Sequence, residues 1–371
     1  MTWFPFHIGL KSCLGIDLGT SGIKIIQLAK RGERIALEKY GEIAAQVFYE
    51  ESYRTFEKST LLLSTQDIAR AILAIFSEAK ISEKKAFFAI PDFASFFTSF
   101  ELPPMNREEI SQAVRFEARH HIPLPLAEVT LDWSIVEGET SDKKKTPLKI
   151  LLVAVSNDLI DQYRQIVTMS NLDLRGLEVE AFGLVRALIG EEKRVVVILD
   201  IGARTTTVNI IDQGILKVSH SFDIAGNELT HVLAKALNIE HAEAEDFKKT
   251  HGLKFLSLNQ EPSQNNEEPS LIAKKVGEIL RPLIDMILSE LERTSQNFYQ
   301  IQGRKIEKII LAGGTARLPG LKEYFSKMLK KEIEIANPFL NISYPPILEE
   351  ALKEMGPSYA IAVGMALRGL E

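Results

Sequence analysis

The sequence of 371 residues lacks most features of a secreted, membrane-spanning or nucleic-acid-binding protein. Its one cysteine, Cys13, leaves no internal disulfide and fits a reducing compartment. No stretch approaches the ~18 apolar residues of a membrane-spanning helix. A net charge of −6 argues against a dedicated nucleic-acid binder, because neutralising phosphates takes clustered Lys and Arg.

The first residues, MTWFPFHIGLKSCLGID, lack the basic start, apolar core and cleavage site of a signal peptide, so the cytoplasm is the expected location. The segment TWFPF could touch a membrane surface or a partner, although packing against the body of the protein is the favoured interpretation. Neither a Walker A motif nor a GxGxxG follows any strand, which excludes P-loop and dinucleotide sites. The length predicts two domains, or one large domain with subdomains.

What the sequence does contain is a repeated strand–turn–strand pattern. The run CLGIDLGTSGIKIIQL predicts two strands around a Gly-rich turn that follows Asp17. A second run, LDIGARTTTVNII, aligns on IDLGTSGIKIIQL without a gap and places Asp200 on Asp17. Two such β-meanders some 180 residues apart predict two related lobes. A third glycine turn, at Gly313 and Gly314, ends the buried strand KIILA.

The chemistry of these turns favours a phosphate ligand with a metal ion. A turn of Gly and hydroxyl residues exposes backbone N–H groups that bind anions, and glycine lets a ligand approach the backbone closely. An Asp beside the turn can hold a hydrated Mg²⁺ that bridges to phosphate, and Lys24 can pair with a phosphate as a point charge. For the first turn alone, a plain β-hairpin is an equally good interpretation. The phosphate-loop candidates are Gly19, Thr20, Ser21, Gly22, Lys24, Gly202, Thr205 and Thr206, with Asp17 and Asp200 for the metal.

The ordered set GIDLGTSGIK, LDIGARTTTV and LAGGTARLPG resembles the phosphate-1, phosphate-2 and adenosine motifs of the actin/Hsp70/FtsA ATPase superfamily. EVEAFGLVRAL and SYAIAVGMAL stand where that superfamily has its two interlobe helices. The resemblance implies an α/β, two-lobed actin-like (ribonuclease-H-like) fold that binds ATP and Mg²⁺.

The resemblance also implies roles for individual residues. Glu245 and Lys248 match the helix that contacts ribose and adenine, and Gly313, Gly314 and Thr315 match the adenosine turn. Glu178 and Glu180 border the first interlobe connection, where the superfamily keeps the residue that polarises the attacking water. Ala203 and Arg204 occupy a stretch where related ATPases often have Gly or Asp. Both slow hydrolysis and nucleotide acting only as a conformational ligand therefore stay open.

The run EARHHIPLPLAEVTLDW resembles the signature of the PilM family of type IV pilus assembly, and the insert around it stands where FtsA-like proteins carry subdomain 1C. The chain stops after the second interlobe helix, without the terminal amphipathic helix of FtsA, which favours PilM. This implies docking of the N-terminal peptide of a PilN-like inner-membrane protein between subdomains 1A and 1C. PilO and the pilus motor ATPases are implied indirectly. The resemblance places the protein at the membrane only through these partners.

The aromatic run PDFASFFTSFELPP is the expected wall of the peptide groove, with Phe93, Phe96, Phe97 and Phe100, although the core of the insert is an equally good place for them. Two alternatives to the docking role stay open. One is an FtsA-like filament-forming ATPase, and the other is a sugar or acetate kinase of the same superfamily. Self-association is also open.

The expected division of the chain follows the superfamily. It assigns 1–86 to the first part of subdomain 1A, 87–175 to insert 1C, 176–192 to the return to 1A with the first interlobe connection, 193–236 to the first part of 2A, 237–304 to 2B, 305–344 to the second part of 2A, and 345–371 to the second interlobe connection and the return to 1A.

Overall fold

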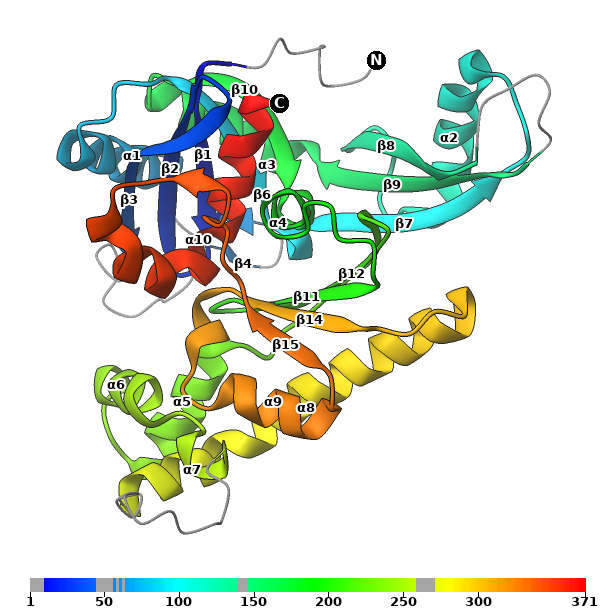
Figure 1. Ribbon diagram of the computed structural model, residues 1–371. Coiled ribbons are helices and arrows are strands. Elements are labelled where there is room, and N and C mark those ends of the chain that lie inside the picture. The colour runs from blue at the N-terminus through cyan, green and yellow to red at the C-terminus, as the bar shows by residue number, and fades with distance from the viewer. Residues whose placement is uncertain (1–9, 45–55, 58–59, 62–63, 139–145, 258–270) are drawn as a thin grey trace.

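The computed structural model describes residues 10–44, 56–57, 60–61, 64–138, 146–257 and 271–371. They form two lobes, each with a central β-sheet, and a smaller sheet that projects from the first lobe (Figure 1). Within these ranges no helix has both the length and the apolar character needed to cross a membrane.

Lobe 1 contains a six-stranded sheet in the order β10-β6-β1-β2-β3-β16. Its meander is antiparallel, as the sequence predicts, whereas β6 and β10 run parallel to β1. A separate two-stranded ribbon is formed by β4 and β5. The strands are β1 (Ser12–Gly19), β2 (Gly22–Arg31), β3 (Arg34–Ala44), β4 (Phe56–Glu57), β5 (Thr60–Leu61), β6 (Lys85–Ile90), β10 (Asp173–Val179) and β16 (Ile342–Ser343).

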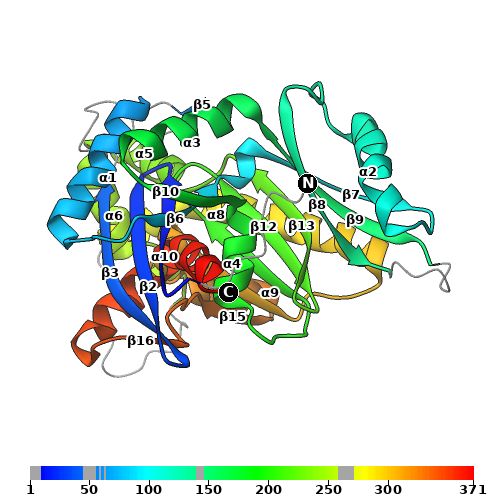
Figure 2. The same ribbon diagram turned by 90° about the horizontal axis from the view of Figure 1, so that it is seen from above.

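Helices cover both faces of the lobe 1 sheet, as the view from above shows (Figure 2). Alternate side chains of β1 divide between two cores, so that Ile16 packs with α1 (Thr65–Ala79) and α3 (Asn157–Met169). Cys13 faces the opposite core, with α10 (Glu349–Leu370). Period-two alternation along each strand produces these two apolar faces.

Lobe 2 contains a five-stranded sheet in the order β13-β12-β11-β14-β15. One face packs against the long helix α8 and its neighbours, and the other face joins the core that includes α4 and α10. The strands are β11 (Val196–Ile201), β12 (Thr206–Asp212), β13 (Ile215–Phe222), β14 (Lys308–Ala312) and β15 (Glu332–Ile335); the helices are α5 (Gly226–Leu237), α6 (His241–His251), α7 (Lys254–Ser257), α8 (Leu271–Gln302) and α9 (Leu321–Leu329).

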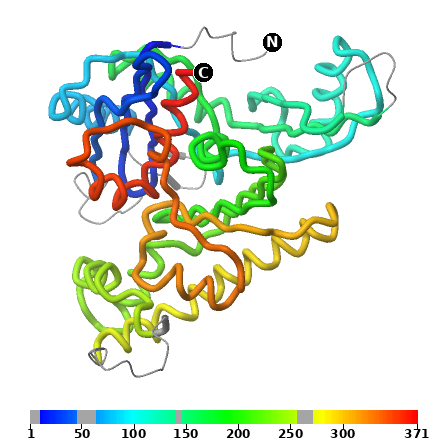
Figure 3. The backbone as a smooth tube through the Cα atoms, in the orientation of Figure 1, coloured from blue at the N-terminus to red at the C-terminus, as the bar shows by residue number. Residues whose placement is uncertain are grey.

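The insert, residues 95–156, consists of β7 (Ser95–Leu102), α2 (Arg107–His121), β8 (Val129–Glu137) and β9 (Leu148–Ser156). Its sheet has the order β7-β9-β8. Asn106 and Glu109 form the capping box that the sequence predicts at the start of α2. The backbone tube shows the insert and α6 at opposite ends of the molecule (Figure 3).

The expected boundaries of the insert at 87 and 175 were wrong, because β6 and β10 belong to the lobe 1 sheet. Helix α3, also assigned to the insert, packs with α1 in the lobe 1 core. Apolar strands look alike in the sequence whichever sheet they join. The chain also returns to lobe 1 earlier than the expected residue 345, since β16 pairs with β3. The other boundaries and the subdomain assignments stay predictions.

The two lobes meet at the crossing of α4 (Glu180–Leu188) and α10. A Cβ added to Gly364 of α10 would lie 2.0 Å from the carbonyl oxygen of Gly183 in α4. Only a glycine therefore lets the two backbones touch here. The described residues also form three short turns, η2 (Asp92–Ala94), η3 (Gly314–Arg317) and η4 (Pro346–Leu348).

Candidate functional site

The first glycine turn is the tight hairpin between β1 and β2. Gly19 and Gly22 face each other, with Thr20 and Ser21 as the turn residues. Asp17 lies opposite Lys24 two residues further from the turn. The Asp17 side chain is only 3% exposed, and its Oδ1 atom makes no hydrogen bond.

The second glycine turn joins β11 to β12 in lobe 2. It is closed by a 3.0 Å hydrogen bond from the N–H of Gly202 to the carbonyl of Thr205. Asp200 stands at its entry, opposite Thr207. The Thr206 side chain is fully buried, and its hydroxyl donates to the carbonyl of Ile224 at 2.6 Å. The Thr206 hydroxyl thus bonds within the fold, and the place of Thr206 in a phosphate loop stays a prediction.

Four carboxyl groups from both lobes converge between the two turns: those of Asp17, Asp92, Glu180 and Asp200. Burial raises the pKa of Asp200 to about 7, the carboxylates of Asp92 and Asp17 add to the effect, and Lys24 opposes it. Burial likewise raises the pKa of Asp17, again against the charge of Lys24. Burial and then the charges of Asp17, Asp92 and Asp200 hold the pKa of Glu180 well above its usual range. Such a cluster is an anionic site that a cation would stabilise.

Asp92 is a member of this cluster that the sequence did not predict. Its Oδ1 accepts the N–H of Ala181 at 3.0 Å, and its own N–H donates to Glu180 Oε2 at 3.3 Å. Asp92 thus caps the start of α4 from another part of the chain. Its Oδ2 atom is buried without a hydrogen bond. Burial raises the pKa of Asp92 to about 7, although the Ala181 N–H and the nearby Asn209 amide lower it.

Of the two glutamates predicted near the first connection, the structure brings only Glu180 to the cluster. The Glu178 carboxylate instead pairs with Arg186, at 2.6 and 2.9 Å, and faces Arg368 at 3.9 Å. Glu178 was therefore wrong as a candidate for polarising water. Two glutamates two residues apart separate here because Glu178 lies in strand β10, one residue before its end, and Glu180 begins helix α4.

The third glycine turn closes the site on the lobe 2 side. Gly313 has a φ of +83°, and a Cβ there would lie 2.4 Å from Asp200 Oδ1. The backbone of this turn therefore touches the carboxylate directly, which only glycine permits. A Cβ on Gly314 would meet no atom within 4 Å, so this residue faces open space. The Thr315 hydroxyl donates to the carbonyl of Gly202 at 3.3 Å and ties the two turns together.

The start of α5 supports the second turn from behind, which the sequence did not predict. The N–H groups of Gly226 and Asn227 donate to the carbonyls of Gly202 and Ala203, at 3.0 and 2.7 Å. A Cβ on Gly226 would lie 2.7 Å from the Thr315 hydroxyl. The strand–glycine–helix junction DIAGNEL was the available signal in the sequence.

Glu245 and Lys248 form an internal ion pair of 2.6 Å. Lys248 is 6% exposed, and its ammonium also donates to the Gly226 carbonyl and the Thr230 hydroxyl, at 2.9 and 2.7 Å. The three donors of Lys248 are thus used inside the protein, and its ribose or adenine contact stays a prediction. The pair fixes α6 against the start of α5. The ligand contact of Glu245 stays a prediction.

The residues present fit a hydrated magnesium ion better than a directly ligated one. Within the described ranges, no group of three or more His, Cys, Asp or Glu side chains is arranged to hold a metal. Asp17 and Asp92 nevertheless each have a buried carboxylate oxygen without a hydrogen bond. Buried acceptors of this kind need a donor, and the water shell that Mg²⁺ retains supplies donors.

A cavity of about 250 Å³ separates the insert from lobe 1. Its insert wall includes Trp133 of β8 and Val153 of β9, and its lobe 1 wall includes Val179 of β10 and Phe182 of α4. Polar groups stand among these apolar residues, namely the carboxylates of Asp132 and Glu178 and the guanidinium of Arg368. We call this space the insert cavity.

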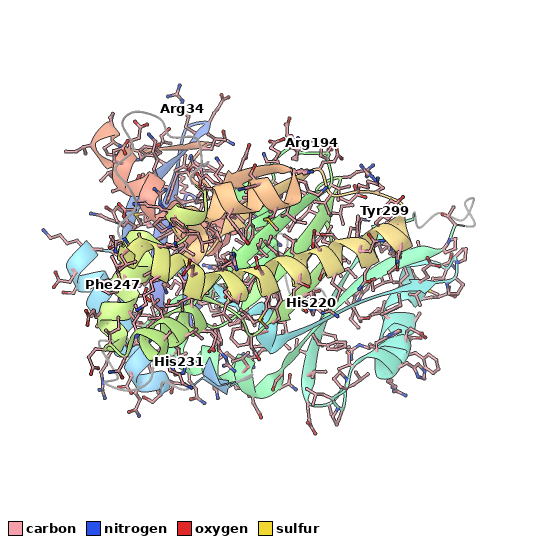
Figure 4. All side chains as sticks on the ribbon, turned by 90° about the horizontal axis from the view of Figure 1, so that it is seen from below. Arg34, Arg194, His220, His231, Phe247 and Tyr299 are labelled. Carbon is pink, nitrogen blue, oxygen red and sulfur yellow. The ribbon has the colours of Figure 1, made fainter. Side chains whose placement is uncertain are left out.

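The aromatic run expected as the groove wall does not line the insert cavity. Phe93 and Phe97 instead line a second cavity, of about 550 Å³, which reaches Asp92 and Thr205 from the side of β13. Phe100 is 8% exposed in the core of the insert. Beside the second cavity, His220 of β13 lies against α8 (Figure 4), with its Nε2 atom 3.5 Å from Glu290 Oε2. The insert cavity is walled largely by strands in which apolar and polar residues alternate. This alternation shows which residues share a face of the strand, but it does not show which face lies against another lobe, so the sequence did not predict these walls.

The family model for type IV pilus assembly protein PilM matches residues 15–370. The chain belongs to this family. One chain of a solved PilM–PilN type IV pilus biogenesis complex is similar to it over 98% of this chain and 99% of that chain, with a TM-score of 0.82 and 23% identity. MreB 5 of Spiroplasma citri bound to AMPPNP is similar over 96% and 95%, with a TM-score of 0.55 and 14% identity.

Curated relatives of this PilM-family chain include the cell division protein FtsA. The FtsA of Agrobacterium fabrum is 23% identical over 230 residues, which is 58% of this chain and 50% of the relative. The FtsA of Pseudomonas aeruginosa is 21% identical over 236 residues, 60% of this chain and 54% of the relative. The chain thus spans about half the length of the curated relatives it matches. Together with the solved structures, these likenesses confirm the expected actin-like fold.

Proposed function

We propose that this PilM-family protein is a nucleotide-dependent adaptor, which binds Mg²⁺·ATP between its lobes and docks the cytoplasmic N-terminal segment of a PilN-like membrane protein in the insert cavity. The observation that carries the proposal is the position of the two sites on one pair of chain segments. Ile90 and Val179 line the insert cavity, and Asp92 and Glu180, one or two residues further along, belong to the carboxylate cluster.

In the proposed nucleotide site, the chain supplies complementary groups from both lobes. Asp17 and Asp200 accept hydrogen bonds from the water shell of a magnesium ion, which supplies the positive charge that their raised pKa values show to be missing. The turn of Gly19 to Gly22 and the turn of Gly202 to Thr205 offer backbone N–H groups to phosphate. Lys24 adds a positive charge to the same space.

Two residues then decide what happens to the nucleotide. Glu180 is the carboxyl group that we assign to orienting a water molecule, and burial together with the neighbouring carboxylates holds its pKa well above its usual range. Open space above Gly314 leaves room for the base beside the third turn. MreB 5 of the same fold, solved with AMPPNP, supports the proposed nucleotide binding.

In the proposed docking site, two strand edges border an apolar cavity. Among the described strands, β8 ends the insert sheet and β10 ends the lobe 1 sheet, so both have unpaired backbone groups. An extended peptide can pair with such an edge while its apolar side chains fill the cavity. The exposed carboxylate of Asp132 suits one of the basic residues that flank the cytoplasmic end of a membrane span, whereas Glu178 is already paired with Arg186. The partner would hold the protein at the inner membrane.

A thermal-melt titration with Mg²⁺·ATP tests the nucleotide site. At 100 times the dissociation constant, ATP should stabilise the wild type by ~2.7 kcal/mol. Asp17→Ala and Asp200→Ala should each lose the shift, because each removes one side of the metal site. Asp132→Asn, which changes a carboxylate of the insert cavity, should keep it. An unchanged melting temperature in the wild type would refute the proposed nucleotide binding.

A further inference from the structure

Helix α2 covers the outer face of the insert sheet and turns its other side to solvent. Val114 and Ala118 of α2 pack in one core with Leu152 of β9. The neighbouring residues of that strand, Leu151 and Val153, point the opposite way and line the insert cavity. Helix α2 and the insert cavity therefore lie on opposite faces of one three-stranded sheet.

The solvent side of α2 carries basic and aromatic side chains. Arg115, Phe116, Arg119 and His120 share this side, because residues three and four apart are neighbours on a helix. All four are exposed, and Phe116 is 62% exposed. Among the described residues, no carboxylate pairs with Arg115 or Arg119. We call these four residues the α2 stripe.

The acidic residues of α2 do not neutralise the stripe. Glu109 belongs to the capping box, and Glu117 faces His121, with 3.6 Å between its Oε1 atom and Nε2. Glu108 shares the side of the stripe but lies two turns before the first arginine, about 10 Å along the axis. Charges at that distance are largely screened at physiological salt. The stripe is therefore locally positive, although the chain has a net charge of −6.

A positive stripe around an exposed aromatic ring suits an anionic lipid surface. Arginine pairs with phosphate through two parallel hydrogen bonds, and an apolar side chain enters the boundary between headgroups and acyl chains. Leu124, just beyond the helix, is 47% exposed and adds a second apolar group. No residue of α2 lines the insert cavity or the second cavity, so the stripe is part of a convex surface without a groove for a peptide. A deformable lipid surface can close around such a shape.

The position of α2 in the molecule agrees with a membrane contact. Figure 1 shows α2 above the insert sheet, on the side away from lobe 2 and level with the C-terminal end of α10. Arg368, in the last turn of α10, lines the insert cavity. A membrane-anchored segment docked in that cavity would hold this side of the molecule near the bilayer. A weak affinity for lipid then suffices, because the effective concentration is high.

We propose that the α2 stripe contacts the anionic lipid headgroups of the membrane in which the partner is anchored. The inference rests on the proposed docking function for the closeness of the membrane, but the affinity of the stripe for lipid does not depend on docking. Each arginine near an anionic surface strengthens binding about five-fold. Loss of both arginines should therefore weaken lipid binding about ten-fold or more.

Vesicle flotation with the full chain tests the lipid contact. The probe is a vesicle of phosphatidylcholine mixed with anionic phosphatidylglycerol, at millimolar lipid, and pure phosphatidylcholine is the neutral comparison. We expect the wild type to bind the anionic vesicles, and to bind them less tightly as salt is raised. Arg115→Gln combined with Arg119→Gln should weaken binding about ten-fold or more. Phe116→Ser should weaken it by an amount that salt does not change, because the lost contact is apolar.

Arg70→Gln combined with Arg164→Gln is the matched control, since it removes the same charge from exposed arginines of α1 and α3. This double variant should bind the anionic vesicles as the wild type does. Equal losses in both double variants, or binding that survives the α2 variants, would overturn the inference. No binding of the wild type to anionic vesicles would also overturn it and leave an acidic protein as the occupant of the stripe.

A second measurement keeps the lipid contact separate from the docking proposal. A synthetic peptide of the partner's cytoplasmic segment is titrated by calorimetry into the wild type and the α2 double variant. Equal affinities are expected, because the insert cavity lies on the other face of the sheet. A weaker affinity in the variant would assign the arginines to the docking site and overturn the lipid contact. Failure of the peptide to bind the wild type would overturn docking, and vesicle flotation would still decide the lipid contact.

Discussion

Carboxyl groups at the centre of the molecule are held where they are costly to ionise. Asp17 and Asp92 are 3% and 4% exposed, and each has an oxygen atom without a donor. Buried acceptors without partners destabilise a fold. Their retention between two glycine turns is therefore better explained by a ligand than by stability.

The burial of the Asp92 carboxyl group makes the free energy of unfolding depend on pH. Its pKa in the folded protein is raised to about 7, above the ~3.9 of an unfolded chain. The folded state then binds more protons between these values, so stability falls as the pH rises from about 4 to about 7. Without nucleotide, we expect the free energy of unfolding from urea titrations to fall by about 1–3 kcal/mol more in the wild type than in Asp92→Asn between pH 5 and pH 7.5.

In the variant, asparagine keeps an acceptor for the Ala181 N–H. The substitution also removes the Asp92 charge that raises the pKa of Asp200 and Glu180, which lowers both pKa values and adds to the difference between the two slopes in the same direction. Parallel slopes for wild type and variant would contradict the raised pKa.

For individual residues, the sequence predicted the two carboxylates that occupy matching positions in the repeated segments and missed the one that lies outside the repeat. Asp17 and Asp200 were found because each precedes a glycine turn in two aligned segments. Asp92 has no such copy. Its role depends on β6 and β10 being parallel neighbours, which brings Ile90 opposite Val179 and so Asp92 beside Glu180. Pairing between strands 90 residues apart has no local signal.

Among the secondary-structure elements, α6 is joined to α5 by hydrogen bonds from the buried ammonium of Lys248, which also pairs with Glu245 inside α6. Lys248→Met removes the donor to Gly226 and Thr230 and leaves Glu245 without its main partner. We expect a loss of about 1–3 kcal/mol in the free energy of unfolding, measured by urea titration.

Lys249→Met is the matched control, since Lys249 is mostly exposed and lies 3.4 Å from the other oxygen of Glu245. An exposed pair contributes about 0–1 kcal/mol, so the control should change stability little. Equal losses in both variants would show that the buried contacts of Lys248 do not stabilise the α5–α6 pair.

The sequence predicted individual helices and strands better than it predicted which sheet each strand joins. The hairpins, α1 and the capping box of α2 follow from patterns within about 20 residues, and the structure confirms them. The insert was predicted too wide because its flanking strands, β6 and β10, carry the same apolar runs as its own strands. The sheet that a strand joins is decided by neighbours distant in the sequence.

For the molecule as a whole, the insert touches both lobes. It grows out of lobe 1, and at its far end Glu137 of β8 pairs with Lys217 of β13 in lobe 2, at 2.5 Å. The Arg204 guanidinium of the second turn lies 5.5 Å from the ring centre of Phe93, just before the insert. A change in the angle between the two lobes should therefore move the insert relative to lobe 1 and alter the shape of the insert cavity.

Lys217→Met tests this link without changing either site. We expect Mg²⁺·ATP to change the affinity of the wild type for a partner peptide by about five-fold or more, measured by calorimetry with and without nucleotide. In the variant the two affinities should converge, while ATP alone still binds. Lys193→Met, an exposed lysine of lobe 2, should behave as the wild type. Undiminished coupling in Lys217→Met would reject Glu137–Lys217 as its carrier.

The crossing of α4 and α10 limits what such a movement can be. Gly183 and Gly364 bring two backbones into direct contact, and the methyl group of Met365 packs against Gly183, so the two helices have little room to slide past each other here. We expect the crossing to act as a pivot, about which the lobes can turn while their centres keep the same separation. Signals that pass from one lobe to the other must then be carried as changes of angle.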